Sequence, residues 1–323
     1  MKKRIIILGS IVLLVCLAWT AGWYFITSQI RQQVEALAFA DGETAPQLTC
    51  ATLGIGGYPF NIDISCTDTV IVSGDVLVEF PEVRASAIVY RPTHLLASAR
   101  GAAEISDAFT GQRSAVSWDG LEASLRLDNW RIARLSLIGT NVSWNDLLFG
   151  DAMIARANNV EMHLLDIPER HDATQGLADL ALFARATGLD YPGAAVTAAD
   201  IELESEITRL PDDLREIDTA GLIPAWQRAG GRIDTIALRS KDAGSDLEAT
   251  GNLVLDEAGL LNGQIDITSQ GVAERIGAMI EEPLRTLVLG VPGADGRHLN
   301  QVNFRAGTVS SGLVPLGVIP PLF

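Results

Sequence analysis

The chain begins with a long apolar segment that is preceded by positive charge. Residues 5–26 contain no charged side chain, and Lys2, Lys3 and Arg4 stand directly before them. A helix of about 22 residues is about 33 Å long, enough to cross a hydrocarbon core of about 30 Å. Because basic residues stay on the cytoplasmic side, the pattern predicts a single-pass helix with its N-terminus in the cytoplasm and everything after residue 26 across the membrane.

Aromatic residues support this interpretation. Trp19, Trp23 and Tyr24 lie towards the far end of the apolar segment, and such amphipathic rings settle at the depth of the lipid headgroups. They are therefore predicted to belong to the anchor and to mark its outer boundary.

Two other interpretations fit this segment less well. A cleaved signal peptide would need small residues close to the apolar core, whereas Ala38-Phe39-Ala40 follows a polar segment and lies far from it. An acylated cysteine would need a small residue before it, and Cys16 is preceded by Val15. We therefore favour an uncleaved anchor, with cleavage as the alternative.

The helix is expected to continue beyond the membrane as a stalk over residues 27–40. Ile30, Val34 and Leu37 recur with spacings of four and three residues, which places them on one face of a helix. We expect this apolar stripe to dock on the domain that follows.

Short β-type segments then dominate the chain. Leu121, Ala123, Leu125 and Leu127 alternate with polar residues, a pattern typical of an antiparallel sheet with one face in water. Ile201 and Leu203 alternate in the same way with Glu202, Glu204 and Glu206. Further segments of this type are residues 69–72, 75–80, 84–90, 95–101, 114–118, 130–137 and 140–144.

Three later segments have a helical period. They are residues 172–187, 211–229 and 272–289. In the first, Leu177, Leu180 and Ala184 share one helical face. The second is predicted as two helical pieces, with Trp226 holding the second piece to the sheet.

The expected fold is therefore α+β and predominantly β: an N-terminal transmembrane helix followed by one or more long, curved antiparallel sheets with a few packing helices. Residues 1–4 form the cytoplasmic end, residues 5–26 the span, residues 27–40 the stalk, and residues 41–323 the β-rich domain. If this domain has two halves, we expect them to meet near residues 168–192.

Two cysteines flank a predicted hairpin. Gly57, Tyr58 and Pro59 provide its turn, and position 58 lies midway between Cys50 and Cys66, so that the hairpin brings the two cysteines opposite one another. A disulfide closing about 15 residues would stabilise the fold by about 3 kcal/mol. It would form only in an exported domain. Two free buried thiols are the alternative, and no His or further Cys stands nearby at the spacing of a metal site.

Composition narrows the choice of partners. The net charge of −16 and the pI near 4.6 argue against nucleic acid, whose binding depends on Lys and Arg neutralising phosphates. Apolar residues make up 48% of the chain but aromatic residues only 6%, so that the apolar mass is mainly aliphatic, as in strands packed on helices.

Three parts of the chain resemble the bacterial domain-of-unknown-function family 2125. They are the element formed by Cys50, Gly57-Tyr58-Pro59-Phe60 and Cys66, the glycine-bounded hairpin of residues 251–267, and the C-terminal segment 307–322. They are similar, more distantly, to AsmA-type envelope proteins. The resemblance covers most of the chain after the anchor. The first family has no settled activity. The second implies outer-membrane lipid homeostasis and, for some members, β-rich grooves that conduct lipids, although this chain is much shorter than those members.

The sequence offers little for catalysis. The four histidines are scattered, and neither a nucleophile elbow nor a phosphate-binding loop is present. We expect no enzyme activity and no cofactor or metal. The favoured function is a periplasmic module, anchored in the inner membrane, that binds or transfers lipid or another hydrophobic ligand. The alternative is an assembly factor whose sheet binds an envelope protein without a ligand.

Overall fold

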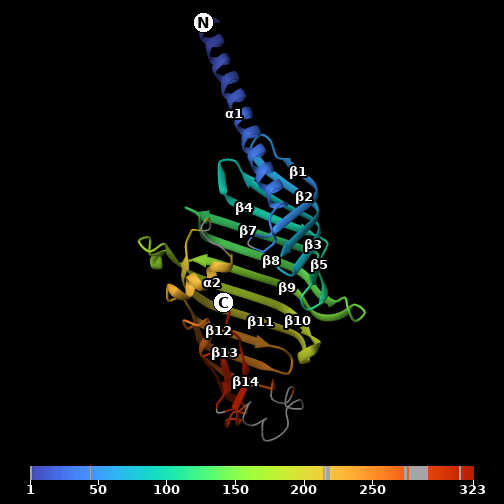
Figure 1. The fold of residues 1–323 in the computed structure, drawn as a ribbon, viewed down its shortest axis with the longest axis vertical. Helices are drawn as coiled ribbons and strands as arrows, with labels where there is room; N and C mark the ends of the chain where they lie inside the picture. The colour runs from blue at the N-terminus through green and yellow to red at the C-terminus, as the bar shows by residue number, and fades with distance from the viewer. Residues whose placement is uncertain are drawn as a thin grey trace. The chain divides into compact units, whose positions relative to one another are not determined.

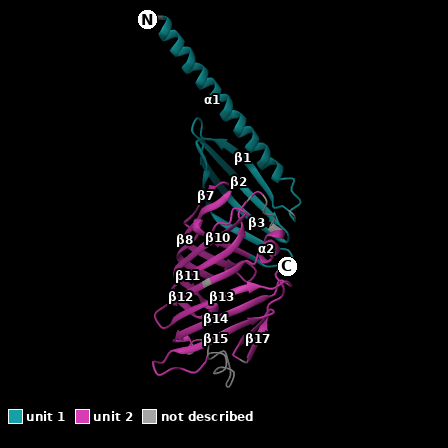
Figure 2. Ribbon diagram, turned by 90° about the vertical axis from the view of Figure 1, so that its left-hand side faces the viewer, with its two compact units in different colours: residues 1–113 teal, residues 114–323 magenta. Residues whose placement is uncertain are grey.

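The computed structural model describes residues 2–43, 45–213, 215, 219–272, 275, 290–312 and 314–323 (Figure 1). The fold is predominantly β, with 59% of residues in strands and 17% in helices, as the alternating patterns predicted. The chain divides into two compact units, residues 1–113 and 114–323 (Figure 2). The segment 168–192, where two halves were expected to meet, lies within the second unit.

The first unit begins with a single helix, α1 (Lys2–Leu37), which combines the predicted span and stalk. Ile30 and Val34 are half-buried as predicted. The docked stripe continues towards the N-terminus rather than the C-terminus, because Trp23 is 7% and Thr27 8% exposed whereas Leu37 is 41% exposed. Trp23, Thr27, Ile30 and Val34 therefore repeat at helical spacing and face the first sheet.

The sheet of the first unit is antiparallel. Its strands are β1 (Gln47–Gly56), β2 (Asn61–Ser73), β3 (Val76–Ile88), β4 (Arg91–Arg100) and β5 (Ala102–Asp107). Strand β2 pairs with β1 on one side and with β3 on the other. The predicted segments 75–80 and 84–90 are one strand, β3, whose first half pairs with β5 and whose second half pairs with β4. The partner changes around Pro81, which has no N–H to donate to a ladder.

The second unit consists of antiparallel strands and one described α-helix, α2 (Thr219–Arg228). Its strands are β6 (Arg113–Ser117), β7 (Gly120–Asp128), β8 (Arg131–Asp146), β9 (Ala152–Asp166), β10 (Leu177–Tyr191), β11 (Val196–Pro211), β12 (Arg232–Lys241), β13 (Asp246–Leu255), β14 (Leu261–Gln270), β15 (His298–Arg305), β16 (Thr308–Ser311) and β17 (Val314–Val318). Two short 3₁₀ helices, η1 (Pro168–Arg170) and η2 (Pro192–Ala194), flank β10.

From β7 to β17 each strand pairs with the next one along the chain, and β6 pairs with β8. Register shifts interrupt the pairing in β8, β10, β11 and β12. Such bulges bend a strand and increase its twist, which agrees with the curved sheet expected from the sequence.

The predicted helix at residues 172–187 is wrong, because most of this segment belongs to β10. Its alanines and leucines have good helix propensity, but β9 and β11 pair with it on both sides. The hydrogen bonds and packing supplied by two neighbouring strands outweigh local propensity.

The second predicted helical segment, 211–229, is confirmed in its later part by α2, where the Trp226 indole donates to the Thr208 carbonyl of β11 at 2.7 Å. Its earlier part differs, because Pro211 ends β11 and most of residues 214–218 lie outside the described part. Apart from Val272 and Arg275, the third segment, 272–289, also lies outside the described residues. The hairpin of residues 251–267 is confirmed by β13 and β14.

Candidate functional site

One face of the second unit's sheet is made mainly of aliphatic side chains, interrupted by Ser205, Ser240, Ser269 and Asn300. The strand register places Leu137, Met162 and Ala184 directly beside one another on β8, β9 and β10. The same row continues through Leu203 on β11 and Leu238 on β12. With the adjoining row, this aliphatic face comprises Leu135, Leu137, Met162, Leu164, Leu182, Ala184, Ile201, Leu203, Ile236, Leu238, Leu247, Ala249, Ile265, Ile267 and Val302.

Burial shows that the aliphatic face is not sealed as a core normally is. Leu137 is 36% exposed, and the other leucines and isoleucines of the face are half-buried. Within the described part of the second unit, the large aliphatic side chains that are buried are Leu180 and Leu255, which lie on the same side of β10 and β13 as the aliphatic face. In a closed core, residues of this size would be mostly buried and surrounded on all sides.

The opposite face of the same strands is polar and carries an alternating ladder of charge. Glu161, Arg185, Glu202, Arg239 and Glu248 are successive cross-strand partners from β9 to β13. Neighbouring strands therefore present opposite charges, which is favourable across a sheet. Because these side chains are solvent-accessible, each pair contributes little to stability. The ladder identifies the face that lies in water.

A pocket of about 210 Å³ is lined partly by the ladder and partly by Ile201 and Leu247, two residues of the aliphatic face. Arg239 binds Glu202 and Glu204, each at 3.2 Å, so that the charges at the pocket neutralise one another. Within the described ranges, His, Cys, Asp and Glu side chains form no group of three that could hold a metal ion. The pocket thus offers ordinary surface ion pairs.

The predicted turn motif contacts the anchor helix directly. Within the first unit, the Trp19 indole donates to the Pro59 carbonyl at 2.9 Å, and the Thr20 and Tyr58 hydroxyls lie 2.8 Å apart. The Trp23 indole donates to the carbonyl of the following Asn61 at 2.9 Å. We call residues 19–24 and 57–61 together the helix–turn junction.

Aromatic rings fill the helix–turn junction. Trp23 meets Tyr24 and Tyr58 edge to face, with ring centroids 5.1 and 5.5 Å apart, and Trp19 lies 6.4 Å from Phe60. Gly57 has φ +95°, and a Cβ there would lie 2.7 Å from the Asn61 carbonyl oxygen. Glycine is therefore required at this position for the turn to close on Asn61.

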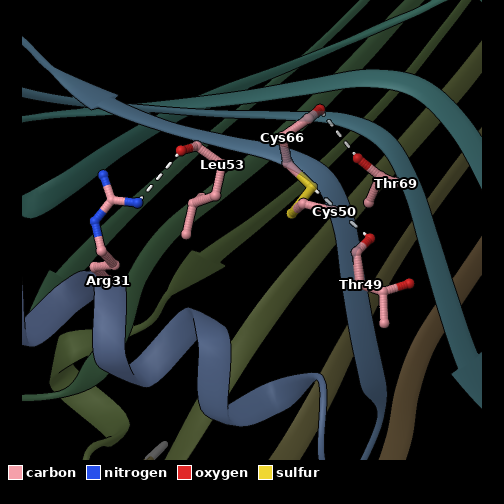
Figure 3. The surroundings of a disulfide bond; sticks show 6 residues. All are labelled: Arg31, Thr49, Cys50, Leu53, Cys66 and Thr69. Atoms are coloured by element: carbon pink, nitrogen blue, oxygen red, sulfur yellow. Dashed lines mark hydrogen bonds between the residues drawn. A yellow bond between two sulfur atoms is a disulfide. The ribbon is translucent and has the colours of Figure 1, made fainter.

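The predicted disulfide is present between Cys50 and Cys66, whose Cα atoms are 5.3 Å apart (Figure 3). The two cysteines are not direct cross-strand partners, because Cys50 pairs with Thr69 and Cys66 with Leu53. The register of β1 and β2 is symmetric about the bond between Pro59 and Phe60, and not about position 58 as predicted. Asp68, with φ +46°, distorts β2 between Cys66 and Thr69.

The stalk is tied to the same hairpin beyond the junction. The Arg31 guanidinium donates to the Leu53 carbonyl at 3.5 Å (Figure 3), and the Gln47 amide donates to the Ala38 carbonyl at 2.8 Å. The hairpin therefore runs alongside α1 with its turn towards the anchor. At the other end of α1, Lys3 and Arg4 are exposed, and Lys2 begins the helix.

Residues 23–320 match the family described as "Uncharacterized protein conserved in bacteria (DUF2125)". The chain belongs to this family. No curated protein and no solved structure matches it. Membership in the DUF2125 family thus agrees with the resemblance carried by the turn motif and the cysteines, and the match begins within the junction, at Trp23.

Sequence reasoning found the residues of the helix–turn junction but not their contacts. Trp19 and Trp23 are four residues apart, a spacing that places both on one helical face and could have predicted a docked turn. Of the aliphatic face, the alternation in the sequence indicated Ile201 and Leu203 on β11, but not their partners on the neighbouring strands. Because residues 172–187 were predicted to be helical, the alternation of Leu180, Leu182 and Ala184, which has the period of a strand, was not recognised.

Proposed function

We propose that this DUF2125 protein is a non-enzymatic, membrane-anchored module of the bacterial envelope, whose aliphatic face holds the acyl chains of a lipid. The observation that carries this proposal is the contrast between the two faces of one sheet. The face formed by the row from Leu137 to Leu238 is aliphatic and half-exposed, whereas the other face carries the charge ladder. An acyl chain gains about 0.8 kcal/mol for each CH₂ removed from water.

The dimensions of the aliphatic face suit a lipid. Neighbouring strands lie about 4.8 Å apart, so that the row from β8 to β14 extends over about 29 Å. One acyl chain occupies about half of a hydrocarbon core of about 30 Å. The face is therefore long enough for one complete acyl chain lying across the strands.

We further propose that the β-rich part lies in the periplasm and α1 in the inner membrane. The helix is long and apolar enough to cross a bilayer, and Lys2, Lys3 and Arg4 precede it, which favours a cytoplasmic N-terminus. The disulfide between Cys50 and Cys66 supports an oxidising compartment for the hairpin.

Native mass spectrometry of the full chain released from detergent tests the lipid proposal. We expect one or more bound phospholipids, and a reduced bound fraction in the double variant Leu203→Asp, Leu238→Asp, because two carboxylates on the aliphatic face would be costly to desolvate. The matched control is Glu204→Gln, which changes the neighbouring residue on the opposite face. Lipids bound around α1 are unaffected by either change.

Circular dichroism establishes that each variant is folded, and Leu203→Ser provides a milder polar change if the double variant is not. Equal lipid occupancy in the wild-type chain, Leu203→Ser and Glu204→Gln would contradict the proposal. A protein retained on the aliphatic face in place of lipid would instead support the assembly-factor hypothesis.

A further inference from the structure

The tip of the β1–β2 hairpin contacts a part of α1 that should lie inside the bilayer. A hydrocarbon core of about 30 Å takes up about 20 helical residues. Counted from Ile5, the first residue after the basic cluster, these residues extend to Tyr24. The hairpin tip binds α1 at Trp19, Thr20 and Trp23, which lie within this length.

We propose that the hairpin tip, residues 57–60, is itself immersed in the membrane interface, so that the first unit is seated in the leaflet farther from the N-terminus. Tyr24 marks the outer end of the span, and Trp19, which is bonded to the hairpin tip, lies about 7 Å deeper along the helix. The tip is therefore immersed to a depth of about 7 Å. Tilting α1 would draw still more of the helix into the bilayer. The free part of α1 before Trp19 is about 21 Å long, too short to cross a core of about 30 Å alone.

The backbone carbonyls at the tip are suited to a lipid environment, where an unsatisfied polar group is costly. The Pro59 and Asn61 carbonyls accept from the two indoles of α1. The Gly57 carbonyl accepts from the Asn61 N–H at 2.8 Å. The Phe60 carbonyl accepts from the Val89 N–H at 2.9 Å. These bonds are all internal to the first unit.

The side chains at the tip have the chemistry of a membrane interface. Tyr58 is 50% and Phe60 59% exposed, although both are large aromatic residues. Residues 57–62 contain no charged side chain, and the first carboxylate along β2, Asp63, accepts a hydrogen bond from the Ser86 hydroxyl at 2.5 Å. Aromatic side chains of this type are enriched at the boundary between lipid and water.

A second turn lies beside the tip and adds to the same surface. The Val89 N–H bonds to Phe60, and Asn61 and Arg91 both pair with Ile88. Tyr90 is 68% exposed, and Arg91 is also exposed. A guanidinium at this level is placed to bind lipid phosphate, while Tyr90 enters the interface with Phe60.

Electron paramagnetic resonance of a nitroxide on the full chain, reconstituted in vesicles of phosphatidylethanolamine and phosphatidylglycerol, tests the immersion. The label is attached at Phe60→Cys or, separately, at Tyr90→Cys, in a Cys16→Ala background. Cys50 and Cys66 remain bonded to each other. The control is Val76→Cys, because Val76 follows β2 at the end away from the tip, about 40 Å along the strand. Leu14→Cys marks the middle of the span.

We expect the labels at Phe60 and Tyr90 to be relaxed more by oxygen, which is concentrated in lipid, than by a water-soluble nickel chelate, with Val76 showing the reverse. Preferential relaxation by nickel at both Phe60 and Tyr90, with oxygen still favoured at Leu14, would overturn the immersion but leave the span intact. Nickel access at Leu14 as well would refute the span. Both results are independent of lipid binding by the aliphatic face.

Discussion

At the scale of single residues, aspartates fix the tight connections of the fold. Asp107, Asp190 and Asp256 each accept a hydrogen bond from a backbone N–H of a nearby turn or loop residue, at 2.8 to 3.0 Å. The donors are Thr110, Ala198 and Leu260. These bonds favour the charged carboxylate and hold the pKa of each aspartate below its ordinary value.

The lowered pKa values predict how stability depends on pH. A carboxyl whose pKa is lower in the folded state stabilises the fold fully above its unfolded pKa, about 3.9 for Asp. This contribution is lost as the pH falls through the lower folded pKa. We expect the urea midpoint of the full chain in detergent to decrease as the pH falls below about 4, and to decrease less in Asp256→Asn, which keeps an acceptor but does not titrate. An identical pH profile for Asp256→Asn would contradict this role of Asp256.

At the scale of elements, the helix–turn junction fixes α1 to the first sheet. Trp23 is 7% exposed and bonds to Asn61, whereas Phe25, two residues further on, is 65% exposed. Replacing a buried Trp by Ala costs about 3 kcal/mol, which corresponds to faster local opening of the docked hairpin.

We therefore predict that Trp23→Ala increases amide exchange in β1 and the first half of β2 by about 100-fold. Phe25→Ala is the control and should leave this exchange unchanged. Hydrogen–deuterium exchange of the full chain in detergent measures both variants. Equal protection of β1 in the two variants would show that Trp23 does not hold the junction together.

The sequence predicted those elements in which local pattern and tertiary context agree. The apolar run gave α1, the turn chemistry of Gly57 and Pro59 gave the first hairpin, and the alternation around Leu203 gave β11. It misassigned residues 172–187, where alanine and leucine satisfy a helical and a strand period equally well. The diagonal position of the disulfide depends on the distortion at Asp68, which no sequence pattern signals.

At the scale of the whole molecule, charge and apolar surface are kept apart. The net charge of −16 would repel anionic headgroups, so that attachment to a membrane depends mainly on apolar and aromatic contacts. These are concentrated in α1 and at the hairpin tip within the first unit. In the second unit, the aliphatic face supplies the apolar surface for the proposed ligand, while the charge ladder keeps the other face in water.

The central claim is that the aliphatic face, and not the polar face, contacts lipid. Site-specific photo-crosslinking of the full chain in native membranes tests it directly, with a benzophenone side chain at Leu238 or at its neighbour Arg239. These two positions lie on opposite faces of β12. We predict phospholipid adducts, identified by mass spectrometry, at Leu238 and not at Arg239. Equal adduct yields at the two positions, or adducts at Arg239 alone, would contradict the proposed function.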